Sequence, residues 1–274
     1  MSTSAKPSSK KSNFLHRLDV RFPWLKIAAV CLVGVIIILD LLDLTVSKVK
    51  DPSTQIKIAP MSYHPRVTKR VLEGKKLVAL TFDDGPSDAT TPNLLDILYQ
   101  EDVPATFFVL GKMARLYPDI IRREAAEGHT VASHTMYHQN LIRISASAVQ
   151  ADINEANAVY NSILGRMPTL TRAPYGNVNA AVRNSVGTPI ILWSVDTLDW
   201  KNKATDPIVS TAMSQVHDGA VILMHDIHPT SVAAVPVLIK TLRDAGYEFV
   251  TIPELATIRG VNMANGAIYY RFNP

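Results

Sequence analysis

Two adjacent aspartates in the run TFDDGPS, residues 81–87, are the residues of this chain most suited to chemistry. The apolar run 77–80 precedes them and is typical of a buried strand, which the Gly-Pro pair after Asp84 must end. A carboxylate beside a protein core is costly unless a positive charge or a proton neutralises it. Asp83 and Asp84 therefore predict a cation or a proton at this strand end.

His134 and His138, in the run HTVASHTMYH, could supply ligands for such a cation. Their spacing of four predicts two imidazoles on one side of a helical turn, where both can bind one metal ion. Two His and one Asp leave the fourth position of a tetrahedral ion open for water or substrate, as in catalytic sites. Alone, the aspartates would be more typical of a capped turn and the histidines of an incidental pair. Their occurrence together favours the metal site.

The elements that would position these residues alternate regularly after Lys76. The pattern predicts strands at 77–82, 105–110, 129–133, 169–172, 189–195, 219–225 and 247–251. It predicts helices at 91–101, 113–127, 147–164, 178–185, 205–217, 230–245 and 252–258. This alternation favours a parallel sheet, and we expect a distorted α/β barrel of about seven parallel strands.

The residues that attract attention all lie near or just after the carboxyl end of a predicted strand, and in a barrel such positions meet at one rim. They are Asp83, Asp84, His134, His138, Arg172, Pro174, Tyr175, Asp196, Asp199, Trp200 and His225, together with the apolar Leu223. A random scatter would place about half of them at the other strand ends. The predicted fold and the predicted site therefore support each other.

Five ordered segments, TFDDGPS, HTMYH, RAPYG, DTLDW and LMH, resemble the motifs of the polysaccharide deacetylase family, the NodB-like domain of carbohydrate esterase family four. The resemblance covers residues 77–258. It implies a distorted (β/α) barrel that removes N-acetyl groups from polymers of N-acetylhexosamine, or O-acetyl groups from xylan. It also implies one divalent ion, usually Zn²⁺, with Co²⁺ or Mn²⁺ as alternatives.

The resemblance assigns a role to each matching position. It implies Asp84, His134 and His138 as metal ligands, Asp83 as base, His225 as acid, Arg172 and Asp199 as their respective partners, the Tyr175 backbone N–H as oxyanion donor, and Trp200, Leu223 and Pro174 as pocket residues. The chain departs from the family at Gln139, where a Pro is usual after the second His. The loop after His138 therefore lacks the fixed φ of Pro.

These roles are physically consistent with amide hydrolysis. A bound Zn²⁺ lowers the pKa of water from ~15.7 towards ~7 and polarises a carbonyl. Arg172 beside Asp83 would keep that base ionised. Asp199 would raise the pKa of His225, so that His225 is protonated and can donate to the leaving amine.

The first 76 residues differ in character from the rest. Residues 1–76 carry 14 Lys or Arg against five Asp or Glu, whereas residues 77–274 carry 14 against 19. A nucleic-acid-binding domain would need a basic face of its own, so we expect no nucleic-acid partner. The single cysteine, Cys31, rules out a disulfide framework or a thiolate metal site within 77–274.

Residues 27–46 are predominantly apolar and approach the ~20 residues of a bilayer span. They follow a basic tail, residues 1–26, which we expect to be cytoplasmic. Asp40 and Asp43 lie towards one end, where they could reach the interface. We favour a single-pass signal-anchor over a signal cleaved near Thr45-Val46-Ser47, and over a buried core helix. Residues 47–76 then form an extracellular stalk, 77–258 a monomeric catalytic domain and 259–274 a C-terminal tail, all outside the cell membrane.

The expected location outside the cell reduces the number of candidate substrates. A tethered extracellular deacetylase would act on peptidoglycan N-acetylglucosamine. Chitooligosaccharides, exopolysaccharides and O-acetylated xylan are alternatives of the same class. A non-catalytic glycan-binding relic is an alternative from another class, but a relic would be free to lose Asp83 or His225, and the chain keeps both.

Overall fold

A computed structural model describes residue 72 and residues 74–273. Within these residues no helix combines the length and the apolar character needed to cross a membrane. The predicted basic tail, signal-anchor and nearly all of the predicted stalk lie outside the described residues.

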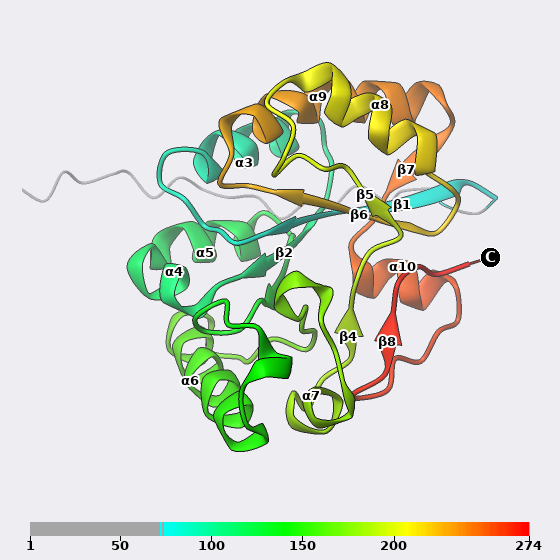
Figure 1. Cartoon of the computed structure of the whole chain (residues 1–274). Coiled ribbons are helices and arrows are strands. Elements are labelled where there is room, and N and C mark those ends of the chain that lie inside the picture. Colours follow the sequence, from blue (N-terminus) through cyan, green and yellow to red (C-terminus); the bar gives the residue numbers. More distant parts are fainter. Residues whose placement is uncertain (1–71, 73, 274) are drawn as a thin grey trace, which may run out of the picture. The chain divides into compact units, whose positions relative to one another are not determined.

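The described chain is a parallel α/β fold, as predicted, with the strands surrounded by helices (Figure 1). The strands are β1 (Lys76–Asp83), β2 (Thr106–Val109), β3 (Thr130–Ser133), β4 (Ile190–Ile191), β5 (Val195–Asp196), β6 (Ala220–His225), β7 (Tyr247–Phe249) and β8 (Ile268–Tyr269). The main sheet has the order β3-β2-β1-β6-β5, and β7 pairs with the first residues of β1. β4 and β8 form a separate parallel pair.

Two segments differ from the predicted strands because they bend between partners. The predicted strand 169–172 is reduced to single bridges from Thr171 to Ser133 and to Ile190. The predicted strand 189–195 is divided into β4 and β5. Ile191 N–H donates to Thr171, whereas Ser194 N–H donates to Val221 in β6, so this segment passes from one neighbour to the next. These contacts connect β3 to β6 and close the distorted barrel.

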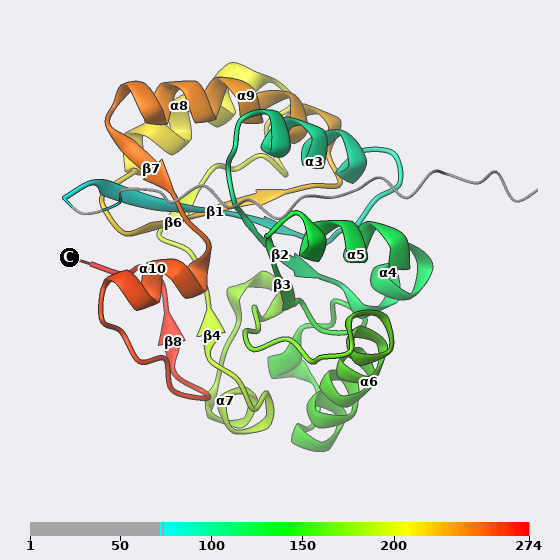
Figure 2. The ribbon, with the colours of Figure 1, turned by 180° about the vertical axis from the view of Figure 1, so that it is seen from behind.

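The helices lie on the outside of the strands in both views (Figures 1 and 2). They are α3 (Thr91–Gln100), α4 (Gly111–Leu116), α5 (Pro118–Ala126), α6 (Ala146–Leu164), α7 (Ala180–Ser185), α8 (Thr205–Gln215), α9 (Pro229–Asp244) and α10 (Ile252–Ile258), with short 3₁₀ helices at Leu141–Arg143 and Pro174–Gly176. The single helix predicted at 113–127 is wrong. Pro118 cannot donate the hydrogen bond that a continuous helix needs, so α5 begins there.

Alternation along β1 separates two cores. Val78, Leu80 and Phe82 pack outward against the helices, whereas Leu77 and Ala79 belong to the cluster inside the barrel. Side chains two apart share a face of a strand. Asp83 therefore continues the inward row, and the alternation directs its carboxylate into the barrel mouth.

The C-terminal residues complete the opposite end of the barrel. β8 pairs with β4, Phe272 is buried, and Phe272 N–H donates to the carbonyl of Gly219, immediately before β6. Gly219 has φ +80°, and a Cβ at this position would lie 1.8 Å from the Phe272 carbonyl oxygen. From the sequence, residues 259–274 were predicted only as a C-terminal tail. The structure places it in the packed domain.

Candidate metal centre and active site

The two aspartates after β1 are separated by a backbone turn. Asp83 is the last strand residue and is 3% exposed. Asp84 has φ 75°, a left-handed conformation that non-glycine residues rarely adopt. This turn releases Asp84 from the strand, so the neighbouring carboxylates can serve different partners.

The two histidines follow β3 but do not lie on a helical turn, so the predicted local structure is wrong there. Residues 134–138 form a loop in which Thr135 has φ 72° and His138 has φ 58°. The reversal of the backbone nevertheless brings the imidazole rings to a centroid distance of 5.1 Å. Such left-handed residues are strained and tend to gather at functional sites. Asp84, Tyr175 and Leu198, in the other loops of the site, share this conformation.

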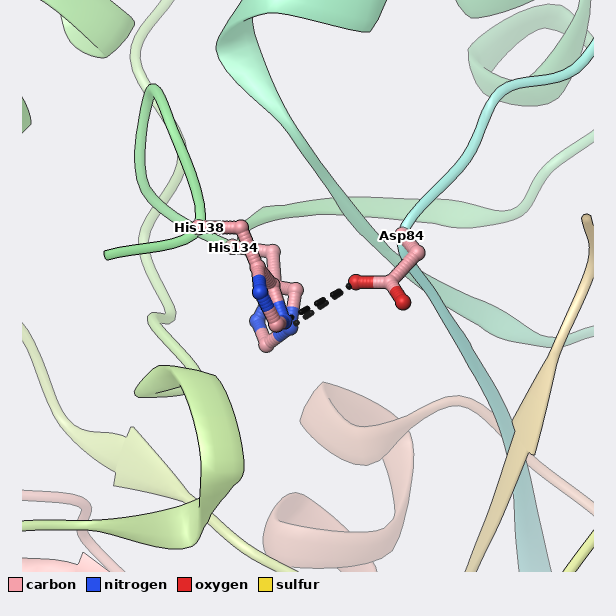
Figure 3. Close-up of side chains that lie close together, drawn as sticks. All are labelled: Asp84, His134 and His138. Atoms are coloured by element: carbon pink, nitrogen blue, oxygen red, sulfur yellow. Dashed lines mark ion pairs between the residues drawn. The ribbon is translucent and has the colours of Figure 1, made fainter. Parts of the chain in front are cut away.

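Asp84, His134 and His138 converge on one point (Figure 3). Asp84 Oδ1 lies 3.4 Å from His134 Nε2 and 3.2 Å from His138 Nε2. One ligand atom from each residue lies within 4.8 Å of the others. Among the described residues, this is the one group of three or more such side chains close enough to hold a metal ion.

The chemistry of these donors fits a cation. His134 Nδ1 lies 2.8 Å from the carbonyl oxygen of Arg172, which can only accept a hydrogen bond. The proton is therefore on Nδ1, and Nε2 presents its lone pair to the site. Asp84 Oδ1 is buried without a hydrogen-bond partner. Without an ion, His134 Nε2 can instead carry a proton. Burial then raises the pKa of Asp84, but the hydrogen bond and charge of the protonated His134, with the charge of His138, lower it to about 2. Asp84 is therefore an anionic ligand at neutral pH.

Arg172 binds the aspartate that does not join this group. Its Nη1 lies 2.7 Å from Asp83 Oδ1, and Asp83 Oδ2 lies 3.7 Å from His134 Nε2. Arg172 is fully buried, and its guanidinium carbon lies 3.9 Å from the centre of the Phe108 ring. It also donates to Thr81 Oγ1 and to the carbonyls of residues 191 and 192. Every direction of the guanidinium is thus fixed, and Asp83 is held beside the metal-binding group.

His225 faces Asp83 from the neighbouring strand. The two residues are direct partners in the β1–β6 register, and both lie on the inward row of their strand. His225 Nδ1 lies 2.8 Å from Asp199 Oδ1, and the His225 backbone N–H donates to Asp199 Oδ2. Burial lowers the pKa of His225, but the hydrogen bond and charge of Asp199 outweigh it and raise the pKa to about 9. His225 is therefore protonated at neutral pH.

A pocket of about 470 Å³ opens over these groups. Asp83, Asp84, His134, His138 and His225 line it, together with Tyr175, Trp193, Asp196, Trp200 and Leu223. Tyr175 and Trp200 are among the exposed aromatic residues, at 61% and 50%. Pro174, which the resemblance implied as a pocket residue, is buried and does not line this pocket.

Trp193 is the wall residue that the motifs missed. It belongs partly to the inner core, and a Cβ on Gly176 would lie 3.0 Å from its ring. It lies two residues after Ile191, an inner-core residue, near the end of the predicted strand 189–195. Alternation along that strand could have identified it. Asp196, which also lines the pocket, was recognised only as a strand-end residue.

A further carboxyl group, that of Asp226, packs against the turn after Asp84. Asp226 is 1% exposed, and its Oδ2 accepts a hydrogen bond from Thr91 Oγ1. A Cβ on Gly85 would lie 2.0 Å from the same oxygen, so the carboxyl group packs directly on the turn after Asp84. Burial raises the pKa of Asp226 to about 7. Only a glycine leaves room for this contact.

Comparison with known proteins adds independent information. The polysaccharide deacetylase family profile matches residues 71–188. Over 180 residues, 66% of this chain and 39% of the relative, the chain is 44% identical to the peptidoglycan-N-acetylglucosamine deacetylase PgdA of Listeria monocytogenes. It is 37% identical to a chitooligosaccharide deacetylase of Bradyrhizobium, covering 67% of this chain and 92% of the relative. The chain thus spans about two fifths of the first curated relatives that it matches.

A solved structure agrees in fold with these sequence matches. It is a family 4 acetyl xylan esterase from Clostridium thermocellum in complex with a cobalt ion, with a TM-score of 0.69 and 32% identity over 73% of this chain and all of the other. Three observations indicate the same family: the fold, the five strand-end motifs, and a relative that is matched over nine tenths of its length. The chain belongs to the polysaccharide deacetylase family.

Proposed function

We propose that this chain is a metal-dependent hydrolase that removes N-acetyl groups from peptidoglycan N-acetylglucosamine. One observation carries the proposal. Asp83 lies beside the group Asp84, His134 and His138 without belonging to it, and faces a His225 that Asp199 keeps protonated. This arrangement places a base and an acid next to a site for a cation.

Asp84, His134 and His138 would hold the ion. Two imidazole nitrogens and one carboxylate oxygen suit Zn²⁺ with an open fourth position, and Co²⁺ or Mn²⁺ are alternatives. When bound, such an ion acts as a Lewis acid that lowers the pKa of water and polarises the acetyl carbonyl. The cobalt ion in the Clostridium thermocellum esterase supports a divalent metal in this family.

Asp83 is proposed as the general base. Arg172 binds its Oδ1, and the carboxylate can take a proton from the attacking water. The Arg172 contacts also orient the carboxylate, because a buried guanidinium with several acceptors cannot turn away. Oδ1 binds Arg172, while Oδ2 points towards His134 and remains available to the reaction.

His225 is proposed as the general acid. Asp199 binds Nδ1 and thereby leaves Nε2–H as the proton that can pass to the leaving amine nitrogen. Without that proton the amine would leave as an unstable anion. We assign the developing oxyanion to the backbone N–H of Tyr175, at the pocket wall where its ring lies 4.7 Å from that of His138. Trp200 and Leu223 would enclose the acetyl methyl group.

The choice of peptidoglycan rests on the relatives and on the expected location. The Listeria monocytogenes relative is named for peptidoglycan N-acetylglucosamine, and the chain is 44% identical to it. We also propose that residues 27–46 anchor the chain in the cell membrane and that the catalytic domain is monomeric and extracellular. A reporter fused after Lys76 should then be detected outside the cell, and a cytoplasmic signal would contradict this topology.

A chitooligosaccharide deacetylase is the second candidate, supported by the Bradyrhizobium relative. Exopolysaccharide and O-acetylated xylan remain alternatives within the same chemistry. The deciding experiment incubates the metal-loaded chain with isolated wall glycan, chitooligosaccharides and acetylated xylan, and measures released acetate. We expect the fastest release from wall glycan. No acetate from any of the three would overturn the proposed activity, and release from xylan alone would overturn the proposed substrate.

A further inference from the structure

A second groove, which Trp200 does not line, adjoins the metal-binding group. Its volume is about 400 Å³. Asp84 and His138 line both cavities, so the two meet at the metal-binding group. The second groove adds Ser87, Lys112, Met113 and Ile227. A polymer whose acetyl group reaches the metal-binding group would therefore continue into this groove.

The two cavities differ in charge. The first carries two tryptophans and Asp196 beside the catalytic groups. In the second, the charged lining residues are Asp84, which is assigned to the metal, and Lys112. Within residues 74–273, no carboxylate forms an ion pair with the ammonium group of Lys112. This cation is therefore available to a ligand in the groove.

The backbone of Lys112 is fixed relative to the metal-binding loop. Lys112 N–H donates to the Met136 carbonyl at 3.1 Å, and Gly111 N–H donates to the Thr135 carbonyl at 2.8 Å. Both acceptors lie between the two proposed histidine ligands. A Cβ on Gly111 would lie 2.5 Å from Met136 Sδ, so glycine permits this close approach. The Cα of Lys112 is therefore held at a fixed distance from the metal-binding group. Its side chain lines the groove, where the ammonium group can contact a substituent of a bound sugar.

We propose that Lys112 forms a subsite for a carboxylate on the sugar next to the one that loses its acetyl group. This proposal rests on the proposed function and deepens it. In a glycan that alternates N-acetylglucosamine with its lactyl ether, every neighbour of the reacting sugar carries a lactyl group, and its carboxylate is free wherever no peptide is attached to it. Chitooligosaccharides lack this charge. Lys112 therefore selects the acid-bearing polymer.

The test compares two tetrasaccharides of equal length, one alternating with free lactyl carboxylates and one of N-acetylglucosamine alone. Acetate release gives kcat/KM for the metal-loaded full chain. Lys112→Ala should lower kcat/KM on the acid-bearing substrate by about threefold to fivefold, as expected for a partly exposed ion pair. The loss should lie in KM, because the contact exists before and during reaction. The rate on the neutral tetrasaccharide should not change.

Charge variants provide the controls. Lys112→Arg should retain the selectivity, Lys112→Glu should lose more of it, and added salt should weaken the wild-type preference. Lys240→Ala removes an exposed positive charge outside both cavities and should affect neither substrate. Equal changes on both substrates, or no change on either, would overturn the subsite. Absence of acetate with wild type on both tetrasaccharides would instead contradict the proposed function.

Discussion

Asp199→Asn should make the rate of acetate release depend on pH around neutrality, where the wild-type rate should be constant. Asp199 is fully buried and holds His225 through two hydrogen bonds of 2.8 and 2.7 Å. The asparagine keeps the shape of the side chain but removes the negative charge. We therefore expect the pKa of His225 to fall from about 9 towards its ordinary value of 6.5.

The size of the effect follows from these two values. Their difference corresponds to about 3 kcal/mol in favour of the protonated ring. At pH 8, the protonated fraction of His225 would fall from ~0.9 to ~0.03, so the rate should drop ~30-fold. At pH 6 most of the rings remain protonated in both proteins, and the same calculation gives a loss below ~1.5-fold. A metal ion bound to Asp84 would offset the negative charge of that carboxylate. Because Asp84 raises the pKa of His225 less than Asp199 does, the wild-type pKa would then lie only somewhat below 9.

The assay is kcat/KM for acetate release from pH 5 to 10, for wild type and variant with equal metal content. Wild type should lose activity only as the pH rises through the raised pKa of His225, because the acid must be protonated. The variant should lose it near pH 6.5. Thermal unfolding is measured in parallel, since the amide leaves one N–H around the former carboxylate without an acceptor and should cost about 1 to 3 kcal/mol. An equal loss at pH 6 and pH 8 would refute the argument that Asp199 acts through the proton on His225.

Three further substitutions test other parts of the site and the fold. Asp83→Asn should lower turnover by at least ~10²-fold with metal still bound. It should also destabilise the fold by about 3 kcal/mol, because Arg172 loses its buried partner. Turnover near that of wild type would exclude Asp83 as the base. His134→Ala should lower the zinc content measured by elemental analysis, and unchanged content would exclude His134 as a ligand. Gly219→Ala should lower the urea midpoint by the equivalent of about 2 kcal/mol or more, because its Cβ would overlap the Phe272 carbonyl oxygen; an unchanged midpoint would contradict this packing.

Residues with regular spacing were predictable from the sequence. β1 and β6 are continuous apolar runs, and their inward rows end at Asp83 and His225, so strand alternation alone places these two side chains at the same rim. The neighbours with which each strand pairs were harder to predict from the sequence. Thr171 makes single bridges to two neighbours, and such a short contact leaves no periodic pattern.

Loop conformations could not be predicted for a different reason. The helical spacing of His134 and His138 suggested a turn, yet their convergence depends on left-handed backbone at Thr135 and His138. The loop that contains them is held by hydrogen bonds that α4 donates to the carbonyls of Thr135 and Met136. It is also held by the one that His134 Nδ1 donates to the Arg172 carbonyl, so its partners are distant in sequence. Asp226 was not among the predicted site residues for the same reason, since its contacts are with Gly85 and Thr91, which follow another strand.

The pairing of Gly219 with Leu77 and with Phe272 has a consequence for attachment. Lys76 begins β1, and the last described residues bind the start of β6, so both ends of the described domain emerge at the base of the barrel. Asp83 lies seven residues further along β1, roughly 23 Å away at the usual rise of a strand. A tether joined at either end would hold the domain from behind, with its mouth directed away from the support. A bead, a fused module or a surface linked there would leave a long glycan free to lie across the opening.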